Sequence, residues 1–374
     1  VKLLPYHDYL QAKGACFGQS GAYERPMWYA LNGKANNYKY SYEYQNWYDS
    51  AKNETINARE NVALFELSPF AKFELSGEKT HSSLQYICAN NIKNEIGYIT
   101  YTQMLNSKGG IEADLTVTCL DKNKFRIVTG SAVREHDKKH ILKHLDKSIK
   151  FNDTTDNIAC LGIFGPKSRD LVSKLFGNYF SNQDFKFGTG KNIIFNDIEM
   201  WFQRISYVGE LGWEIYIPIE KSKQMYELIV SVEKEFDLVH AGAHSMDIMR
   251  MEKGYLHWGH DISPAENPFE AKLGFAVKLN KKENFIGKDY LIKEKKLTKK
   301  IFVMCTINNS KPGNPLVLHD EPIFYDNKIV GETTSGNYSF KYDKNLVFGY
   351  VTKKIDLEKS SAKLEIEIAK KRYK

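Results

Sequence analysis

The sequence has few of the features that mark several common protein classes. Its 374 residues include an odd number of scattered cysteines and no CxxC pair: Cys16, Cys88, Cys119, Cys160 and Cys305. This spacing argues against a disulfide framework and a thiolate zinc site, and it favours a reducing compartment. No run of about 18 apolar residues and no apolar signal core at the start is present. We therefore expect a soluble, cytoplasmic protein that has no membrane partner.

Several enzyme signatures are also missing. The stretch "FGTGKN" at 187–192 lacks the glycine spacing and the Ser or Thr of a phosphate loop. No GxGxxG follows a strand near the start, so a dinucleotide fold and a bound flavin are not expected, and no G-x-S-x-G marks a serine nucleophile. The net charge of +7 is modest and its lysines alternate with acids, which argues against a nucleic-acid partner.

Histidines occur at helical spacing in one segment, where His136, His140 and His144 can share a face. Such a stripe can bind a metal ion, but no strong carboxylate or thiolate partner is placed with it in the sequence. We therefore predict a solvated helix face and no metal site. His240 and His244 are likewise predicted to be structural.

The clearest large-scale feature is a weak internal repeat. The stretch 61–76 predicts strands, Gly77 follows, and 78–87 predicts a helix. The stretch "IACLGIFGPKSRDLVSKLF" repeats the order of strand, Gly165 and helix. A hairpin and another helix follow each unit, and the units lie roughly 90 to 100 residues apart. This order predicts two related α+β lobes.

The remaining segments have different patterns. Residues 1–50 form an aromatic-rich extension with little periodicity, and 281–300 is a lysine-rich linker with a short helix. Residues 301–374 contain short alternating strands separated by Pro and Gly turns, as in a small barrel or sandwich. We expect an extension (1–50), a two-lobed domain (51–280) and a C-terminal β domain (281–374).

Each predicted lobe carries an acid on its hairpin. In "LNSKGGIEADLTV" the apolar residues alternate with polar ones, so Asp114 lies on the face opposite the core. Glu214 lies in "GWEIYIP", and a tyrosine precedes each acid: Tyr101 and Tyr207. Aromatic walls and a carboxylate suit a flat heterocycle with N–H donors at its edge. Arg250, in "MDIMRMEKGY", can supply a counter-charge for a ligand carboxylate.

Several stretches carry a family resemblance, in order between about residues 20 and 350. They are "RPMWYA", "YTQMLNSKGGIEADLTV", "RISYVGELGWEIYIP", "MDIMRMEKGYLHWGHDISPAENPFEAKLGF" and "GETTSGNYS". Together they resemble the tetrahydrofolate-dependent aminomethyltransferase family of the glycine cleavage T-protein. They most resemble the folate-binding C-terminal half of dimethylglycine and sarcosine dehydrogenases. The resemblance implies a three-lobed ring: two related folate-binding α+β lobes and a C-terminal antiparallel β-barrel around a central channel.

The resemblance also implies roles for individual residues. Asp114 matches the catalytic aspartate, and Glu214 matches the glutamate that grips the pterin edge. Tyr101 and Tyr207 match aromatic residues of the folate site, and Arg250 matches an arginine near the folate. The T-protein pattern usually has two adjacent acids where this chain has Ala113 and Asp114, so the dehydrogenase branch fits better.

The implied function is one-carbon transfer to tetrahydrofolate, giving 5,10-methylenetetrahydrofolate. The donor would be an aminomethyl or iminium species from glycine, sarcosine or dimethylglycine metabolism, either a small methylamine or an aminomethyl-lipoyl carrier protein. Because the flavin domain of the dehydrogenase branch is not in this sequence, we expect a separate folate subunit or a piece of a longer polypeptide, with a possible flavin dehydrogenase partner. Two alternatives remain: a folate-dependent demethylase that forms 5-methyltetrahydrofolate, and a non-catalytic folate-binding subunit.

Overall fold

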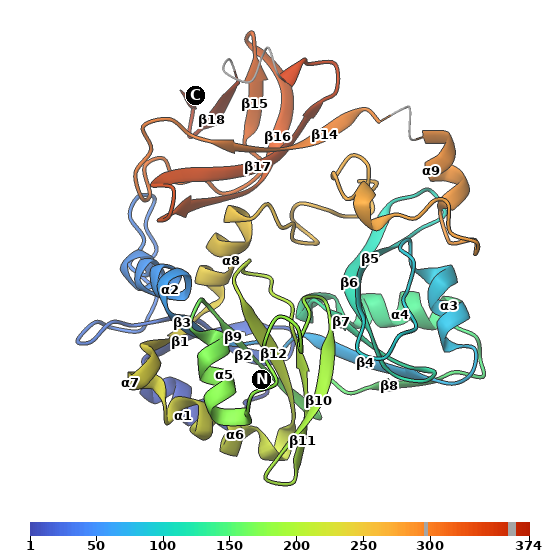
Figure 1. Cartoon of the computed structure of the whole chain (residues 1–374). Helices are drawn as coiled ribbons and strands as arrows, with labels where there is room; N and C mark the ends of the chain where they lie inside the picture. Colours follow the sequence, from blue (N-terminus) through green and yellow to red (C-terminus); the bar gives the residue numbers. More distant parts are fainter. Residues whose placement is uncertain (295–297, 358–363) are drawn as a thin grey trace.

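The chain folds into three lobes, each built around its own β-sheet (Figure 1). The computed structural model describes residues 1–294, 298–357 and 364–374. Two lobes combine a sheet with helices, and the third, near the C-terminus, is a β-sheet lobe. The predicted α+β class with three lobes is confirmed.

The first lobe contains the predicted hairpin of Asp114. Its antiparallel sheet has the order β5-β6-β7-β4-β8: Ile99–Leu105, Ile111–Asp121, Lys124–Thr129, Ala71–Ser76 and Lys150–Asp153. The helices of this lobe are α3 (Thr80–Ile87), a short 3-10 turn (Ser131–Val133) and α4 (Arg134–His144). Ala113, Leu115 and Val117 are buried in one core cluster with side chains of α3 and α4. The alternation in the sequence therefore predicted the buried face of β6 correctly.

The second lobe has a larger, mixed sheet. Its order is β10-β11-β12-β9-β3-β13: Gly190–Phe195, Ile198–Gln203, Gly212–Pro218, Ile158–Phe164, Val62–Glu66 and Leu238–Ala241. Only the β3–β13 pairing within this sheet is parallel. The helices that follow its strands are α5 (Ser168–Phe176), a 3-10 turn (Ile219–Lys221), α6 (Ser222–Val230) and α7 (Glu233–Phe236).

The internal repeat is present in the strand order. The first lobe contains β5-β6-β7-β4 and the second contains β10-β11-β12-β9, which is the same arrangement of four successive strands. Gly77 and Gly165 follow equivalent strands with φ angles of 141° and 139°. In both lobes a glycine thus turns the chain from the strand into the helix, at an angle that side chains disfavour.

The two strands predicted within 61–76 lie in different sheets, which the repeat did not anticipate. The strand β3 joins the second lobe, whereas β4 belongs to the first. All five residues of β3 are buried, because the strand is central in its sheet. The chain therefore crosses between lobes at 67–70, and it crosses back at 154–157.

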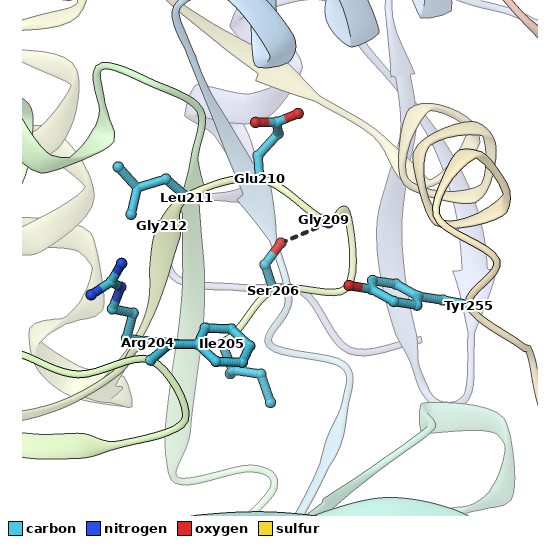
Figure 2. Close-up of a pocket in the computed structure, with 9 residues that line it drawn as sticks. Arg204, Ile205, Ser206, Gly209, Glu210, Leu211, Gly212 and Tyr255 are labelled. Carbon is cyan, nitrogen blue, oxygen red and sulfur yellow. Dashed lines mark hydrogen bonds between the residues drawn. The ribbon is translucent and has the colours of Figure 1, made fainter. Parts of the chain in front are cut away.

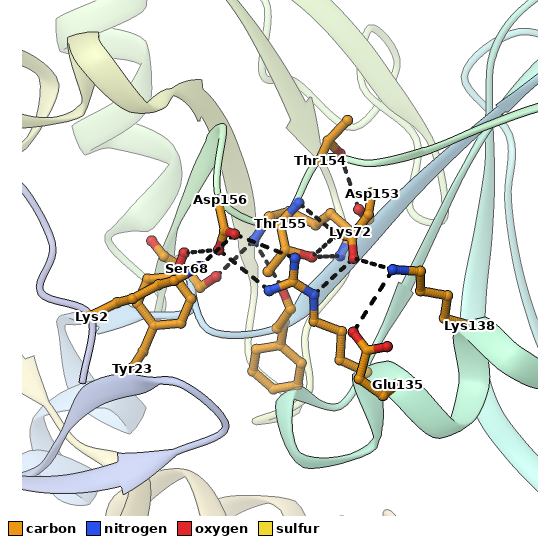
Figure 3. Close-up of polar contacts among 12 residues, drawn as sticks. Lys2, Tyr23, Ser68, Lys72, Glu135, Lys138, Asp153, Thr154, Thr155 and Asp156 are labelled. Carbon is orange, nitrogen blue, oxygen red and sulfur yellow. Dashed lines mark hydrogen bonds and ion pairs between the residues drawn. The ribbon is translucent and has the colours of Figure 1, made fainter.

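A buried lysine joins these two crossings (Figure 3). Lys72 Nζ donates hydrogen bonds to the carbonyl oxygens of Ser68 (2.7 Å) and Phe70 (2.8 Å) in the first crossing. Its backbone carbonyl accepts bonds from Thr154, and its backbone N–H donates to Thr155 Oγ1, in the second. Burial lowers the pKa of Lys72 to about 8. These contacts fix the relative position of the two lobes.

The N-terminal segment is folded, in contrast to the extension predicted for 1–50. It forms α1 (His7–Ala12), β1 (Ala15–Ser20), β2 (Tyr23–Tyr29) and the start of α2 (Tyr48–Glu60). Leu4, Tyr6 and Leu10 are buried in the core cluster of the second lobe. The weak periodicity of these residues reflects a short hairpin whose aromatic side chains pack on that lobe.

The C-terminal lobe is an antiparallel sheet with the order β14-β17-β16-β15-β18-β19. Its strands are Lys300–Thr306, Lys344–Thr352, Lys328–Ser339, Pro322–Tyr325, Glu365–Ile368 and Lys371–Tyr373. The helix α8 (Ala243–Glu252), a 3-10 turn (Gly274–Ala276) and α9 (Lys288–Glu294) precede it, and α9 lies in the predicted linker. Among the described residues, no helix is long and apolar enough to cross a membrane.

Candidate functional site

Asp114 lies on β6 directly opposite Gln103 of β5. Gln103 Nε2 donates a hydrogen bond of 2.8 Å to Asp114 Oδ1. Burial raises the pKa of Asp114 to about 6, while hydrogen bonds from Gln103 and Tyr101 act in the opposite direction. Asp114 is therefore a partly exposed but largely desolvated carboxylate held in place by neighbours, which distinguishes it from an ordinary surface acid.

Tyr101 lies on the same strand as Gln103 and forms one wall beside Asp114. Its ring stacks on Phe275, with centroids 6.1 Å apart and planes inclined by 24°. Burial raises the pKa of Tyr101 well above its usual value, and the charges of Asp114 and Tyr207 raise it further. Phe275, which is 66% exposed, was not predicted as a site residue, although it ends the stretch "FEAKLGF" that carries part of the family resemblance.

Tyr207 lies in the loop between β11 and β12. Its hydroxyl donates to the carbonyl oxygen of Leu256 at 2.8 Å, and its ring stacks on Tyr255 with centroids 6.1 Å apart. Burial raises the pKa of Tyr207, and Asp114 is among the charges that add to this rise. The two predicted tyrosines and Asp114 thus occupy one electrostatic neighbourhood, although they come from different lobes.

A cavity of about 330 Å³ adjoins this loop (Figure 2). Its lining residues are Phe187, Arg204, Ile205, Ser206, Gly209, Glu210, Leu211, Gly212 and Tyr255. Arg204 and Tyr255 lie on opposite sides of it. None of the predicted site residues lines this cavity, but its lining residue Tyr255 stacks on Tyr207, and its lining residue Ser206 precedes Tyr207 in the chain.

Glu214 lies on β12 with a set of partners of its own. Tyr216 Oη donates to Glu214 Oε2 at 2.6 Å, and Gln203 Nε2 approaches the same oxygen at 3.4 Å. Burial raises the pKa of Glu214 to about 7, against the effect of these two hydrogen bonds. Within the described part of the chain, Oε1 has no hydrogen-bond partner, so it can accept a bond from a ligand.

The two acids occupy different positions in the repeat, which corrects the expectation of equivalent hairpins. Asp114 is on β6, the second strand of the first-lobe meander, whereas Glu214 is on β12, the third strand of the other. The lobes meet where Thr118 Oγ1 donates to Gln203 Oε1 at 2.7 Å. Thr118 is four residues from Asp114 on the same face of β6, about 13 Å at 3.3 Å per residue.

Arg250 is buried, and its guanidinium is bound by the protein. Nε donates to Asp247 Oδ1 at 2.8 Å, and Nη1 donates to Asp261 Oδ2 at 2.6 Å and to a backbone carbonyl. Nη2 donates to Ser335 Oγ at 2.9 Å, on β16. Because these bonds use four of the five donors, the geometry supports a joint between α8 and the C-terminal lobe. The predicted counter-charge for a ligand carboxylate is not supported by it.

The predicted solvated histidine face is only partly solvated. The side chain of His136 is 43% exposed, but it contacts Glu112 at 3.3 Å and Asp137 at 2.9 Å. His140 Nε2 is buried without a hydrogen-bond partner in the described part of the chain, and burial lowers the pKa of His140 to about 4. Among the described residues, no group of three or more His, Cys, Asp or Glu is placed to hold a metal ion.

Comparison with known proteins assigns the family. A match to the GCVT N-terminal domain covers residues 6–281, and a match to the glycine cleavage T-protein C-terminal barrel domain covers 300–374. The chain belongs to the GCVT family. The predicted resemblance and the expected aminomethyltransferase-like class are therefore confirmed.

Individual relatives agree with this assignment. The chain is 33% identical to human mitochondrial dimethylglycine dehydrogenase over 373 residues, which is 98% of this chain and 42% of that protein. It is 30% identical to an aminomethyltransferase of Halothermothrix orenii, covering 83% of this chain and 87% of the relative. The fold matches the aminomethyltransferase T structure of Bartonella henselae with a TM-score of 0.82, at 21% identity and with 100% and 95% coverage. The chain thus spans about two fifths of the dehydrogenase's length.

Proposed function

We propose that this chain transfers a one-carbon unit from an aminomethyl or iminium donor to tetrahydrofolate, giving 5,10-methylenetetrahydrofolate. The observation that carries the proposal is the desolvated Asp114, held by Gln103 beside the Tyr101–Phe275 stack. A carboxylate among aromatic side chains suits a cationic carbon–nitrogen species, because the low local dielectric strengthens their attraction.

The carboxylate and the aromatic side chains of the site fit a reduced folate. Glu214 Oε1 is free to accept N–H donors from the pterin edge, and Tyr101, Phe275 and Tyr207 offer flat apolar surfaces. When bound, tetrahydrofolate supplies the nucleophilic nitrogens that accept the carbon. Glu214 would therefore hold and orient the pterin, and we place Arg250 as the side chain that positions α8 against the C-terminal lobe.

In this proposal Asp114 stabilises the positive charge of the donor and is itself held in one orientation. Above its pKa of about 6 the carboxylate is ionised, so it can stabilise a cation as the carbon is transferred. Gln103 holds one carboxylate oxygen, which reduces the freedom of Asp114 and favours a single reactive geometry. The aromatic side chains exclude water and thereby limit loss of the carbon as formaldehyde.

The donor and partner are proposed from the family branch. The similarity to dimethylglycine dehydrogenase favours a methylamine oxidised by a flavin dehydrogenase, and the similarity to aminomethyltransferases keeps an aminomethyl-lipoyl carrier as the other source. A cytoplasmic location stays a prediction.

The test supplies both donors to the purified chain. One reaction contains tetrahydrofolate with a flavin dehydrogenase acting on dimethylglycine or sarcosine, and the other contains an aminomethylated lipoyl carrier. We expect folate-dependent 5,10-methylenetetrahydrofolate with one donor, identified by mass spectrometry. Formation of 5-methyltetrahydrofolate from an onium or methoxy compound would instead establish a demethylase. Folate binding without any product would indicate a binding subunit.

A further inference from the structure

The two acids of the site are each held by a buried glutamine on the neighbouring strand. Gln103 pairs with Asp114 across β5 and β6, and Gln203 pairs with Glu214 across β11 and β12. Both glutamines have an exposed fraction of 0%. The two pairs can therefore be compared group by group.

The amide of Gln203 is fully used inside the protein. Its Oε1 accepts bonds from Thr118 Oγ1 at 2.7 Å and Trp201 Nε1 at 3.2 Å. Its Nε2 donates toward Glu214 Oε2 and Tyr216 Oη. Gln203 has no unsatisfied polar atom, so it needs no ligand.

The amide of Gln103 is used on one side only. Nε2 donates to Asp114 Oδ1, but the buried Oε1 has no hydrogen-bond partner among the described residues. The orientation of this amide follows from chemistry, because an ionised carboxylate only accepts and the nitrogen must face Asp114. Leaving a buried carbonyl oxygen unpaired is unfavourable, so such an atom needs a reason.

We propose that Gln103 Oε1 is a ligand-binding acceptor that takes a hydrogen bond from N5–H or N10–H of the bound reduced folate. The inference rests on the proposed function and extends it to a residue that distinguishes substrate from product. Those two nitrogens carry hydrogen in tetrahydrofolate and carry the transferred carbon in 5,10-methylenetetrahydrofolate. The acceptor therefore has a partner before the transfer and loses it afterwards, which weakens product binding.

The neighbours of Gln103 permit this contact. Asp114 and Tyr101, which flank it, are both partly exposed, and Tyr101 is covered by the exposed ring of Phe275. Because Gln103 Nε2 donates to Asp114 Oδ1, the unpaired Oε1 of the same amide lies close to the carboxylate.

The test is the preference of the chain for tetrahydrofolate over 5,10-methylenetetrahydrofolate, measured by calorimetry. Gln103→Met fills a similar volume without polar groups, and we expect it to reduce this preference about 3- to 10-fold, the effect of one ordinary hydrogen bond. Gln103→Glu, protonated beside Asp114, keeps an acceptor oxygen and a donor, so it should retain most of the preference.

The outcomes separate this inference from the proposed function. Equal weakening of both folates by Gln103→Met would overturn the role of Oε1 and leave the transferase proposal standing. If Gln103→Met fails to fold, loss of the preference in Gln103→Glu overturns the role instead. Failure of the unmodified chain to bind either folate would overturn the proposed function, and this inference with it.

A stability comparison adds a readout that needs no folate. Gln203→Met leaves the hydrogen-bond donors of Thr118 and Trp201 without their acceptor, whereas Gln103→Met leaves no donor unpaired on the Oε1 side. We expect a larger fall in melting temperature for Gln203→Met. A larger fall for Gln103→Met would indicate that Gln103 has a structural role and would contradict the proposal.

Discussion

The first and second lobes build the same four-strand arrangement, yet they place their acids at different positions in it. Asp114 lies on the second strand of its meander beside a stacked pair of aromatic rings, whereas Glu214 lies on the third, bonded by Tyr216. The repeat gives the two lobes the same order of four strands, but the side chains on corresponding strands differ. We interpret Asp114 in the first lobe as the residue that acts in carbon transfer and Glu214 in the second lobe as the residue that binds the folate.

Removing the charge of Glu214 is the largest expected perturbation of recognition. In Glu214→Gln the pterin donors lose a charge-assisted acceptor, at roughly 1.5–3 kcal/mol. We expect the Kd for tetrahydrofolate to rise about 10- to 150-fold, with little change in the transfer rate at saturating folate. Calorimetry gives the affinity. Glu199→Gln, an exposed acid of the same sheet, is the matched control and should leave the Kd unchanged.

The buried side chain of Lys72 tests how much the first crossing between the lobes, 67–70, contributes to stability. In Lys72→Met two carbonyl oxygens lose their donor, and we expect the free energy of unfolding to fall by roughly 1–3 kcal/mol. Urea titration measures this change. The exposed Lys150→Met serves as control on the adjacent strand, and equal stability of the two variants would show that the Nζ bonds of Lys72 do not stabilise the first crossing.

The pH dependence of folate affinity tests the role of Glu214 in the second lobe. Because burial raises the pKa of Glu214 to about 7, its carboxylate is progressively protonated below that pH and loses its capacity to accept. The affinity should fall by up to about tenfold per pH unit below pH 7, and this dependence should disappear in Glu214→Gln. An unchanged pH profile in that variant would assign the titration to another group.

The contribution of Glu214 to the stability of the folate-free chain should change with pH in the opposite direction to its contribution to folate affinity. The folded pKa of about 7 exceeds the unfolded value of about 4.3, so the folded chain binds more protons between these values. The contribution of Glu214 to stability therefore falls as pH rises from about 4 to 7. Glu214→Gln should flatten this part of the stability profile without folate present, which urea titrations at several pH values can measure.

The sequence predicted local elements well and their assembly less well. Alternation in 111–117 identified β6 and its buried face, because a half-buried strand has a strict period of two. The assignment of β3 and β4 to different lobes was missed, since two buried strands have similar composition whichever sheet they join. Periodicity describes which face is buried, but it does not identify the partner strand.

The site residues were proposed from residue type and motif, and their hydrogen-bond partners were not predicted. The charges of Asp114 and Tyr207 both act on Tyr101, and the roles given to these three residues stay predictions. Two partners of Arg250 lie outside the motif "MDIMRMEKGY", since Asp261 is 11 residues away and Ser335 is 85 residues away, whereas Asp247 is part of it. Gln103 was also missed, because a glutamine in a strand gives no signal until its oxygen is seen to be unpaired.

The most direct test of the division between chemistry and recognition is Asp114→Asn, assayed for both transfer rate and folate affinity. We expect the rate of 5,10-methylenetetrahydrofolate formation to fall about a hundredfold, or about 2.7 kcal/mol, because an amide cannot stabilise the cation. The Kd for tetrahydrofolate should change less than about threefold, and the exposed Asp121→Asn should match the unmodified chain in both measurements. A variant as fast as the unmodified chain with its true donor, or a loss of affinity equal to the loss of rate, would contradict the account.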